Sequence, residues 1–209
     1  VANSSTAPTF TDAGIVGTAF YSGGSAYVEV AKDDKWADLL GRNVSLSAWV
    51  KTTLSAGTYY SRIFSCKTDH TDIPGFELTL QGAYTNYNVI GCGNVQNVVR
   101  GQADCNAAFV YVTAVMENGN AQLYVNGQTA GGVKAGGYAL TNSVNPLRLG
   151  RMVSGGNAWR GWLDEMRLQW AAQSVDWVAA DYATQYDPVF AVLGTPEAIN
   201  NYGTMIFLR

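Results

Sequence analysis

The sequence predicts an all-β fold, a two-sheet antiparallel jelly-roll sandwich with one or two short helices. Short segments alternate between apolar and polar residues, turn residues recur about every ten positions, and helical periodicity is confined to two places. Such short strands with regular turns are typical of sandwiches and jelly rolls. The chain has 209 residues, of which 47% are hydrophobic, and this is enough to form one sizeable core.

The N-terminal half predicts five strands and one helix. Residues 17–22 and 26–30 form the first two strands, joined by a turn at Gly23 and Gly24. A short helix is expected over residues 33–41, which begin with two aspartates and end at a glycine. Residues 44–51 alternate clearly, with Trp49 on the more polar face. Two further strands, 60–67 and 76–80, lie on either side of a loop.

The C-terminal half begins with a strand, residues 109–116, that is apolar on both faces and therefore central. Asn-Gly pairs at 118–119 and 126–127 predict hairpin turns. Strands are expected at 146–151 and 159–169, followed by a helix whose N-cap is Ser174. Residues 1–188 then form the jelly-roll domain. Residues 189–209 form a tail or linker, with two weak strands that could pair with the sheet.

The charge balance excludes some classes of partner. The chain has 13 Lys and Arg against 16 Asp and Glu, a formal net charge of −3, which disfavours nucleic acid. No apolar run approaches about 18 residues, so membrane insertion is not expected. Charged residues are only 14% and aromatic residues 12%, so the predicted surface suits uncharged partners, above all sugars.

The cysteines leave a disulfide open, and the N-terminus indicates a piece of a longer chain. Cys66, Cys92 and Cys105 allow at most one disulfide, and Cys92 with Cys105 could close a loop. The alternative is three reduced core thiols. The N-terminus lacks both an initiator Met and a visible signal peptide, so we expect a processed or excised piece of a longer chain.

Four stretches in order resemble the LamG-like, concanavalin A-like jelly-roll family of bacterial secreted or surface proteins. They are residues 17–30, the strand 44–51 ending in Trp-Val-Lys, the hairpin 109–128 with Tyr-Val-Asn-Gly, and the closing strand 160–168 with Asp-Glu. The resemblance covers roughly residues 15–188. It implies a secreted or cell-surface location. The fold is shared by lectins, binding modules, hydrolases and adhesion domains, so it does not decide the function.

The resemblance also implies a structural calcium ion, Ca2+, with Asp164 as a ligand. Calcium requires six to eight oxygen ligands. Family members often supply a further carboxylate from an Asp-Gly pair, but Tyr21 and Ser22 stand at those positions. The alternative is that Asp164 accepts hydrogen bonds from a backbone turn.

Sugar binding needs an aromatic platform with a few hydrogen-bonding groups beside it. The candidates fall into a loop group and a sheet-face group: Trp159, Tyr59, Tyr60, Asp69 and His70 on loops, and Trp49, Glu165 and Arg167 on a sheet face. Trp159 follows a Gly-rich stretch and is expected to expose its indole, whereas Trp162 and Trp177 are expected in the core. Glu165 and Arg167 are two residues apart and point the same way, so the alternative for them is an ion pair.

Catalysis is not expected. Glycosidases require two carboxylates that face each other across the sugar. Hydrolases of this fold usually carry a Glu-x-Asp-x-x-Glu strand, which this sequence lacks, and adjacent Asp164 and Glu165 should face opposite sides. The sequence thus predicts a non-catalytic carbohydrate-binding module attached to other domains of a parent protein. The alternative is a structural or adhesive protein-interaction domain, and a distant third is a glycoside hydrolase or polysaccharide lyase.

Overall fold

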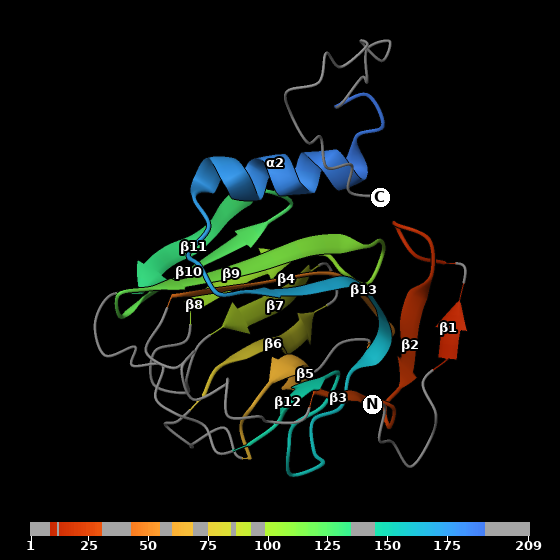
Figure 1. The fold of residues 1–209 in the computed structure, drawn as a ribbon. Helices are drawn as coiled ribbons and strands as arrows, with labels where there is room; N and C mark the ends of the chain where they lie inside the picture. Colours follow the sequence, from red (N-terminus) through yellow and green to blue (C-terminus); the bar gives the residue numbers. More distant parts are fainter. Residues whose placement is uncertain are drawn as a thin grey trace, which may run out of the picture.

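The computed structural model describes residues 9–11, 13–30, 43–54, 60–68, 75–84, 87–92, 99–134 and 145–190. They form two antiparallel sheets packed face to face, with helix α2 (Val175–Tyr186) across the outer face of one sheet (Figure 1). The seven-stranded sheet contains, in spatial order, β1 (Thr9–Thr11), β2 (Ala19–Gly23), β13 (Arg160–Gln169), β4 (Val44–Thr52), β9 (Val110–Glu117), β10 (Asn120–Val125) and β11 (Gln128–Lys134). The six-stranded sheet contains β3 (Val28–Val30), β12 (Leu147–Leu149), β5 (Ser61–Ser65), β6 (Glu77–Tyr84), β7 (Tyr87–Cys92) and β8 (Val99–Ala103). This confirms the predicted two-sheet jelly roll.

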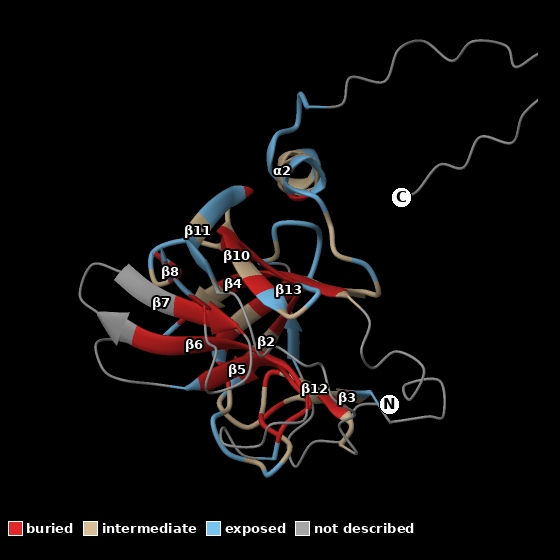
Figure 2. Ribbon diagram, turned by 90° about the vertical axis from the view of Figure 1, so that its left-hand side faces the viewer, coloured by how far each residue is buried: buried red, intermediate tan, exposed pale blue. Residues whose placement is uncertain are grey.

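The core lies between the sheets and follows from the alternation read in the sequence. Along β4, Leu46, Ala48 and Val50 are fully buried in the central cluster, together with Leu78 and Leu80 from β6 in the other sheet (Figure 2). Removing this apolar surface from water is the main stabilising contribution to the sandwich.

The two predicted hairpin turns are present. Asn118 and Gly119 have φ angles of 48° and 80°, and Asn126 and Gly127 have φ angles of 50° and 74°. Positive φ at both central residues is the condition for a type I′ turn, which matches the twist of the strands it joins. These turns connect β9 to β10 and β10 to β11, in the antiparallel order that the sequence predicts.

Two strands, β7 and β8, were not predicted from the sequence. Their patterns are interrupted by Gly91 and Gly101, and glycine is normally depleted in strands. At Gly101 a Cβ atom would lie 2.8 Å from Ala130 Cβ and 2.9 Å from Leu123 Cδ2. The missing side chain therefore allows the two sheets to approach closely there. The helix expected at 33–41 and the strands expected in the tail lie outside the described residues.

The cysteines match the reduced alternative. Cys66, Cys92 and Cys105 are all free and buried. Burial raises the pKa of the Cys92 and Cys105 thiols to about 12, so both stay protonated at neutral pH. Phe76 N–H lies 3.2 Å from Cys66 Sγ and donates to it. These side chains therefore act as small apolar core residues.

Helix α2 begins after Ser174, as the sequence predicts. The Ser174 hydroxyl accepts a hydrogen bond from Trp177 N–H at 3.2 Å. Val178 is buried against Val115 and Tyr124 of the seven-stranded sheet. In the part of the chain that the structure describes, no helix combines the length and apolar character that crossing a membrane requires.

The topology brings three connections between the sheets to one end of the sandwich. β13 lies between β2 and β4 in one sheet, and β12 lies between β3 and β5 in the other, all antiparallel. The ends of β2 and β4 and the start of β13 therefore share one end of their sheet. The β2–β3, β4–β5 and β12–β13 connections cross between the sheets there.

Candidate ligand-binding site

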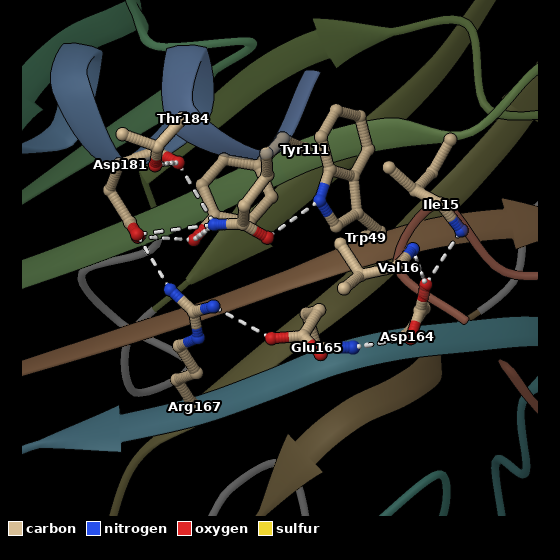
Figure 3. A network of polar contacts seen from close by, with 10 residues as sticks. Ile15, Val16, Trp49, Tyr111, Asp164, Glu165, Arg167, Asp181 and Thr184 are labelled. Atoms are coloured by element: carbon tan, nitrogen blue, oxygen red, sulfur yellow. Dashed lines mark hydrogen bonds and ion pairs between the residues drawn. The ribbon is translucent and has the colours of Figure 1, made fainter. Parts of the chain in front are cut away.

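The sheet-face candidates Glu165 and Arg167 lie beneath helix α2 (Figure 3). Arg167 Nη2 is 2.7 Å from Glu165 Oε2, so the ion pair expected as the alternative is confirmed. Arg167 Nη1 is also 2.6 Å from Asp181 Oδ1 on the helix. Both ends of the guanidinium are therefore engaged in attaching α2 to the sheet.

Trp49 is held in the same network. Its side chain is 1% exposed, and its Nε1–H donates to Gln185 Oε1 at 2.9 Å (Figure 3). Its ring lies 5.0 Å from that of Tyr111 and 5.6 Å from that of Tyr182, measured between centroids. The expectation that Trp49 offers an open platform for a sugar is therefore wrong, because α2 covers that platform.

Asp181 joins the aromatic and charged parts of this interface. Tyr111 Oη donates to Asp181 Oδ2 at 2.5 Å, and Gln185 Nε2 donates to Asp181 Oδ1 at 3.1 Å. Burial, with a further contribution from the hydrogen bond to Asp181, raises the pKa of Tyr111 to about 12. The hydroxyl therefore remains a donor at neutral pH, and one helical carboxylate collects bonds from Tyr111, Gln185 and Arg167.

Glu165 occupies an irregular position in β13. Asp164 is opposite Trp49 and Arg167 is opposite Ser47, with a register shift between them. Glu165 has a φ of 47°, which is uncommon for a residue with a side chain. The strict alternation expected along this strand is therefore wrong at Glu165, because a β-bulge adds one residue there.

Asp164 is a backbone-capping residue. Its Oδ2 accepts from Ile15 N–H at 2.7 Å and from Val16 N–H at 3.0 Å, and its Oδ1 accepts from Glu165 N–H at 2.8 Å (Figure 3). Among the described residues, no group of three or more acidic, histidine or cysteine side chains could hold a metal ion. A carboxylate surrounded by N–H donors does not fit a calcium centre, which needs oxygen ligands. The hydrogen-bonding alternative for Asp164 fits instead.

Trp159 is fully buried, so the expectation of an exposed indole is wrong. Its side chain belongs to the central core cluster and is 0% exposed. Its backbone N–H donates to Gly150 O at 2.7 Å, and its backbone carbonyl accepts from Ser22 Oγ at 2.9 Å. The residue lies where a connection crosses between the sheets, and the large ring is buried there. Trp177, expected in the core, is instead 50% exposed on α2.

A pocket of about 370 Å³ lies at the end of the sandwich where the three inter-sheet connections meet. Its lining residues come from all three connections and their flanking strand ends: Gly24, Leu54, Tyr60, Ser61, Gly155, Asn157, Ala158 and Arg160. Of the predicted site residues, the pocket contains Tyr60, which is 48% exposed. Tyr59, Asp69 and His70 lie outside the described residues.

The wall of this pocket is fixed by backbone hydrogen bonds. Gly155 N–H donates to Met152 O at 3.0 Å, and Met152 N–H donates to Gly156 O at 3.2 Å. The Asn157 carbonyl accepts from Arg62 N–H at 2.9 Å, which ties the loop to β5. A wall held in this way is formed before a ligand arrives, so little ordering is needed on binding.

Arg160 lies over the β2–β3 turn at the edge of the pocket. A Cβ atom on Gly24 would be 3.0 Å from Arg160 Nε and 3.2 Å from its Cγ, and Gly24 has a φ of 102°. Glycine thus provides both the turn conformation and the space for the Arg160 side chain. Within the described residues, the Arg160 guanidinium makes no ion pair or hydrogen bond.

The residues that line the pocket carry an aromatic ring, hydroxyl groups, a carboxamide and a guanidinium. These groups can pack against an apolar face and hydrogen-bond a hydroxyl-rich rim. Sequence reasoning missed Asn157 and Arg160. Gly155 and Gly156 did mark a loop, but Arg160 was read only as the first residue of a strand.

Comparisons with known proteins agree with this architecture. The family model of the concanavalin A-like lectin/glucanases superfamily matches residues 22–192. A comparison with curated proteins finds no significant match. Among solved structures, the chain is similar to domain 4 of an extracellular arabinanase from Geobacillus stearothermophilus, in complex with arabinotriose. Sequence identity is 20%, the TM-score is 0.63, and the match covers 84% of this chain and 81% of that chain.

Two further similar structures are binding domains of botulinum neurotoxins. The serotype G domain has 16% identity and a TM-score of 0.65 over 88% of this chain and 46% of that chain. The DC domain, in complex with SialylT, has 13% identity and a TM-score of 0.63 over the same shares of the two chains. This chain thus spans about half the length of those domains, and at these identities the likeness concerns the fold.

Proposed function

Because the chain belongs to the concanavalin A-like lectin/glucanases superfamily, we propose that it is a non-catalytic carbohydrate-binding module of a larger secreted or cell-surface protein. The fold alone supports many functions, so the proposal depends on the site. The site is the loop pocket, defined as the pocket lined by Tyr60, Asn157, Arg160 and their neighbours between the three inter-sheet connections.

The observation that carries this proposal is the half-exposed ring of Tyr60 beside a rigid polar wall. Sugars have apolar faces surrounded by hydroxyl groups, so they pack on an aromatic ring and hydrogen-bond the groups around it. Tyr60 provides the ring, and Asn157, Ser61 and the backbone of the 155–158 loop provide polar groups. The sheet face beneath α2 is covered, so its aromatic residues serve the fold.

A binding role fits this pocket better than hydrolysis. Glycoside hydrolysis uses two carboxyl groups placed about 5 to 10 Å apart across the scissile bond. Among the residues that the structure describes, none of those lining the loop pocket is acidic. Asp164 and Glu165 are engaged with backbone N–H groups and with Arg167. The similar domain of an extracellular arabinanase was solved in complex with arabinotriose, which also supports a binding role.

A second candidate function is contact with protein. Its supporting observation is the exposure of apolar side chains on α2, where Val175, Trp177 and Tyr186 are 52%, 50% and 61% exposed. Exposed apolar side chains gathered on one element can mark an interaction surface. A module could use α2 for a neighbouring domain and the loop pocket for a glycan.

The test is a glycan array probed with the purified protein, followed by titration of the best glycan. We expect binding, and we expect Tyr60→Ala to weaken it by about tenfold or more. Tyr186→Ala, which removes another exposed tyrosine on α2, is the matched control and should leave the affinity unchanged. A folded protein that binds no glycan on the array would overturn the proposal. Equal losses in both variants would place the site elsewhere.

A further inference from the structure

Arg160 is the one charged residue that lines the loop pocket, among the residues that the structure describes. From this residue we infer that the pocket selects sugars that carry a negatively charged group, which Arg160 binds. This inference rests on the proposed carbohydrate-binding function and adds a chemical class of ligand to it. Its support comes from the partners of the other arginines, from the charge around the pocket and from the geometry of a guanidinium.

The other arginines near this end of the fold have partners within the protein. Arg148 Nε is 2.8 Å from Glu29 Oε2, and Arg62 Nε is 2.9 Å from Glu77 Oε2. Arg151 Nε donates to Gly155 O at 2.5 Å. Arg160 makes no such bond with the described residues, although its backbone carbonyl accepts from Thr53 N–H at 3.0 Å. Its backbone is therefore fixed while its guanidinium is available to a ligand.

The charge around the pocket is positive. Of the described residues that line it, none is acidic, and Arg151 packs against its Gly155, with Nη2 3.2 Å from the position of a Cβ there. The chain as a whole carries a formal charge of −3. The net charge of the chain does not favour an anionic ligand in general, whereas the two guanidinium groups at this end attract one.

The geometry of the Arg160 guanidinium also decides which anionic group on a sugar it binds well. The guanidinium is planar, always charged and able to donate two parallel hydrogen bonds to a carboxylate. A sugar acid would place its carboxylate on Arg160 while its hydroxyl groups reach Asn157 and its apolar face packs on Tyr60. A sulfate ester has the same charge, so the shared chemistry is an anionic sugar and the two sources must be separated by experiment.

The experiment compares paired oligosaccharides that differ in one group. Each neutral hexose oligomer is titrated beside its hexuronate counterpart, in which a carboxylate replaces the 6-hydroxymethyl group, and beside its 6-sulfate ester. We expect tighter binding of at least one charged member by about tenfold or more, weakening as salt rises. Tighter binding of the hexuronate identifies a carboxylate ligand, and tighter binding of the ester identifies a sulfate ligand.

The variant that tests the assignment is Arg160→Gln, with Arg100→Gln as the matched control. Arg100 is also exposed and without a partner among the described residues, but it lies on β8 outside the pocket. We expect R160Q to abolish the preference for the charged member over its neutral counterpart, and R100Q to leave that preference intact. Tighter binding of neutral sugars, or a preference that survives R160Q, would overturn this inference and leave the proposed function standing. Absence of binding to every member would overturn both.

Discussion

Asp181 is the residue on which the attachment of α2 to the seven-stranded sheet depends. Its carboxylate accepts from Tyr111 and Gln185 and pairs with Arg167, while its own backbone belongs to the helix. Charge-assisted bonds of this kind are stronger than those between neutral groups. The same contacts hold Tyr111, which is fully buried, and the guanidinium of Arg167 at the helix–sheet interface.

The pKa of Tyr111 is raised by burial and by its hydrogen bond to Asp181, and this predicts how the free energy of unfolding changes at alkaline pH. The pKa of Tyr111 rises from 10.0 to about 12 on folding, so between these values the unfolded chain releases this proton first. The folded state then binds more protons, and the free energy of unfolding falls as pH rises, by about 2–3 kcal/mol over the window.

Denaturation at several pH values on this interval checks the prediction. Tyr111→Phe removes the titrating group, and its stability should fall less steeply than that of the wild type. Because Tyr124 and Tyr182 also have raised pKa values, some slope should remain in the variant. Identical slopes in the two proteins would contradict the assignment.

Trp49 provides a second prediction at this scale. Trp49→Ala should lower the free energy of unfolding by about 3–5 kcal/mol, because a buried ring is lost and its space is incompletely refilled. Trp177→Ala, at a site 50% exposed, should lower it by less than about 1 kcal/mol. Urea denaturation measures both. Equal effects would show that Trp49 is not buried under α2 in solution.

The two tryptophans also show where residue-level prediction from sequence stops. The alternation along β4 placed Trp49 on the outer face, which is correct, since it pairs with Tyr111 of β9 and Asp164 of β13 on that sheet. Only the packing of α2 decides that this outer face is buried. Trp159 follows a Gly-rich loop in sequence, but its loop crosses between the sheets, and long-range topology controls that crossing.

At the scale of elements, β13 is the strand that departs most from regular geometry. It carries a bulge at Glu165 and a close backbone approach at Gly161. The bulge lies next to the Asp164 cap of residues 15–16 and the Arg167 link to α2. One irregular strand therefore anchors an N-terminal segment, a helix and, through Arg160 at its start, the loop pocket.

The close packing around Gly161 predicts that a single methyl group added there strongly lowers the stability of the fold. A Cβ atom there would lie 2.1 Å from Lys51 O and 2.8 Å from Thr52 Cα, and the residue has a φ of 131°. Gly161→Ala should therefore destabilise the fold by about 2–4 kcal/mol, because β13 must move away from β4.

Gly132→Ala in β11 is the matched control for this change, since nothing lies within 4 Å of its Cβ position. It should change stability by less than about 1 kcal/mol. Thermal or denaturant unfolding of both variants provides the measurement. A G161A protein as stable as G132A would contradict the close approach of the two strands.

Element prediction from sequence worked where the pattern is local. β4 alternates between apolar and polar residues, and β9 is a continuous apolar run. The Asn-Gly turns require only positive φ, and Ser174 caps α2 three residues before Trp177. It failed for β7 and β8, whose patterns are broken by glycines, and at Gly101 of β8 the other sheet approaches closely. Such approaches bring together residues that are far apart in the sequence, so the pattern of neighbouring residues does not reveal them.

At the scale of the whole molecule, the sheet face that packs against α2 lies apart from the pocket that we propose binds a ligand. Helix α2 covers the outer face of the seven-stranded sheet (Figure 1). The loop pocket lies instead at one end of the sandwich, where the inter-sheet connections meet. The loop pocket combines residues far apart in sequence, from Gly24 to Arg160. The sequence predicted the strands that create this end and one of its residues, Tyr60, but the meeting of the loops follows from the strand order.

The central claim is that a glycan binds in the loop pocket and not on the sheet face beneath α2. Its most direct test is an NMR titration of the ¹⁵N-labelled protein with the best glycan from the array, following the backbone amides. We predict shifts concentrated at Gly24, Tyr60, Ser61 and residues 155–160, with the amides of α2 unchanged. Shifts concentrated in α2 and around Trp49, with residues 155–160 unmoved, would contradict the account.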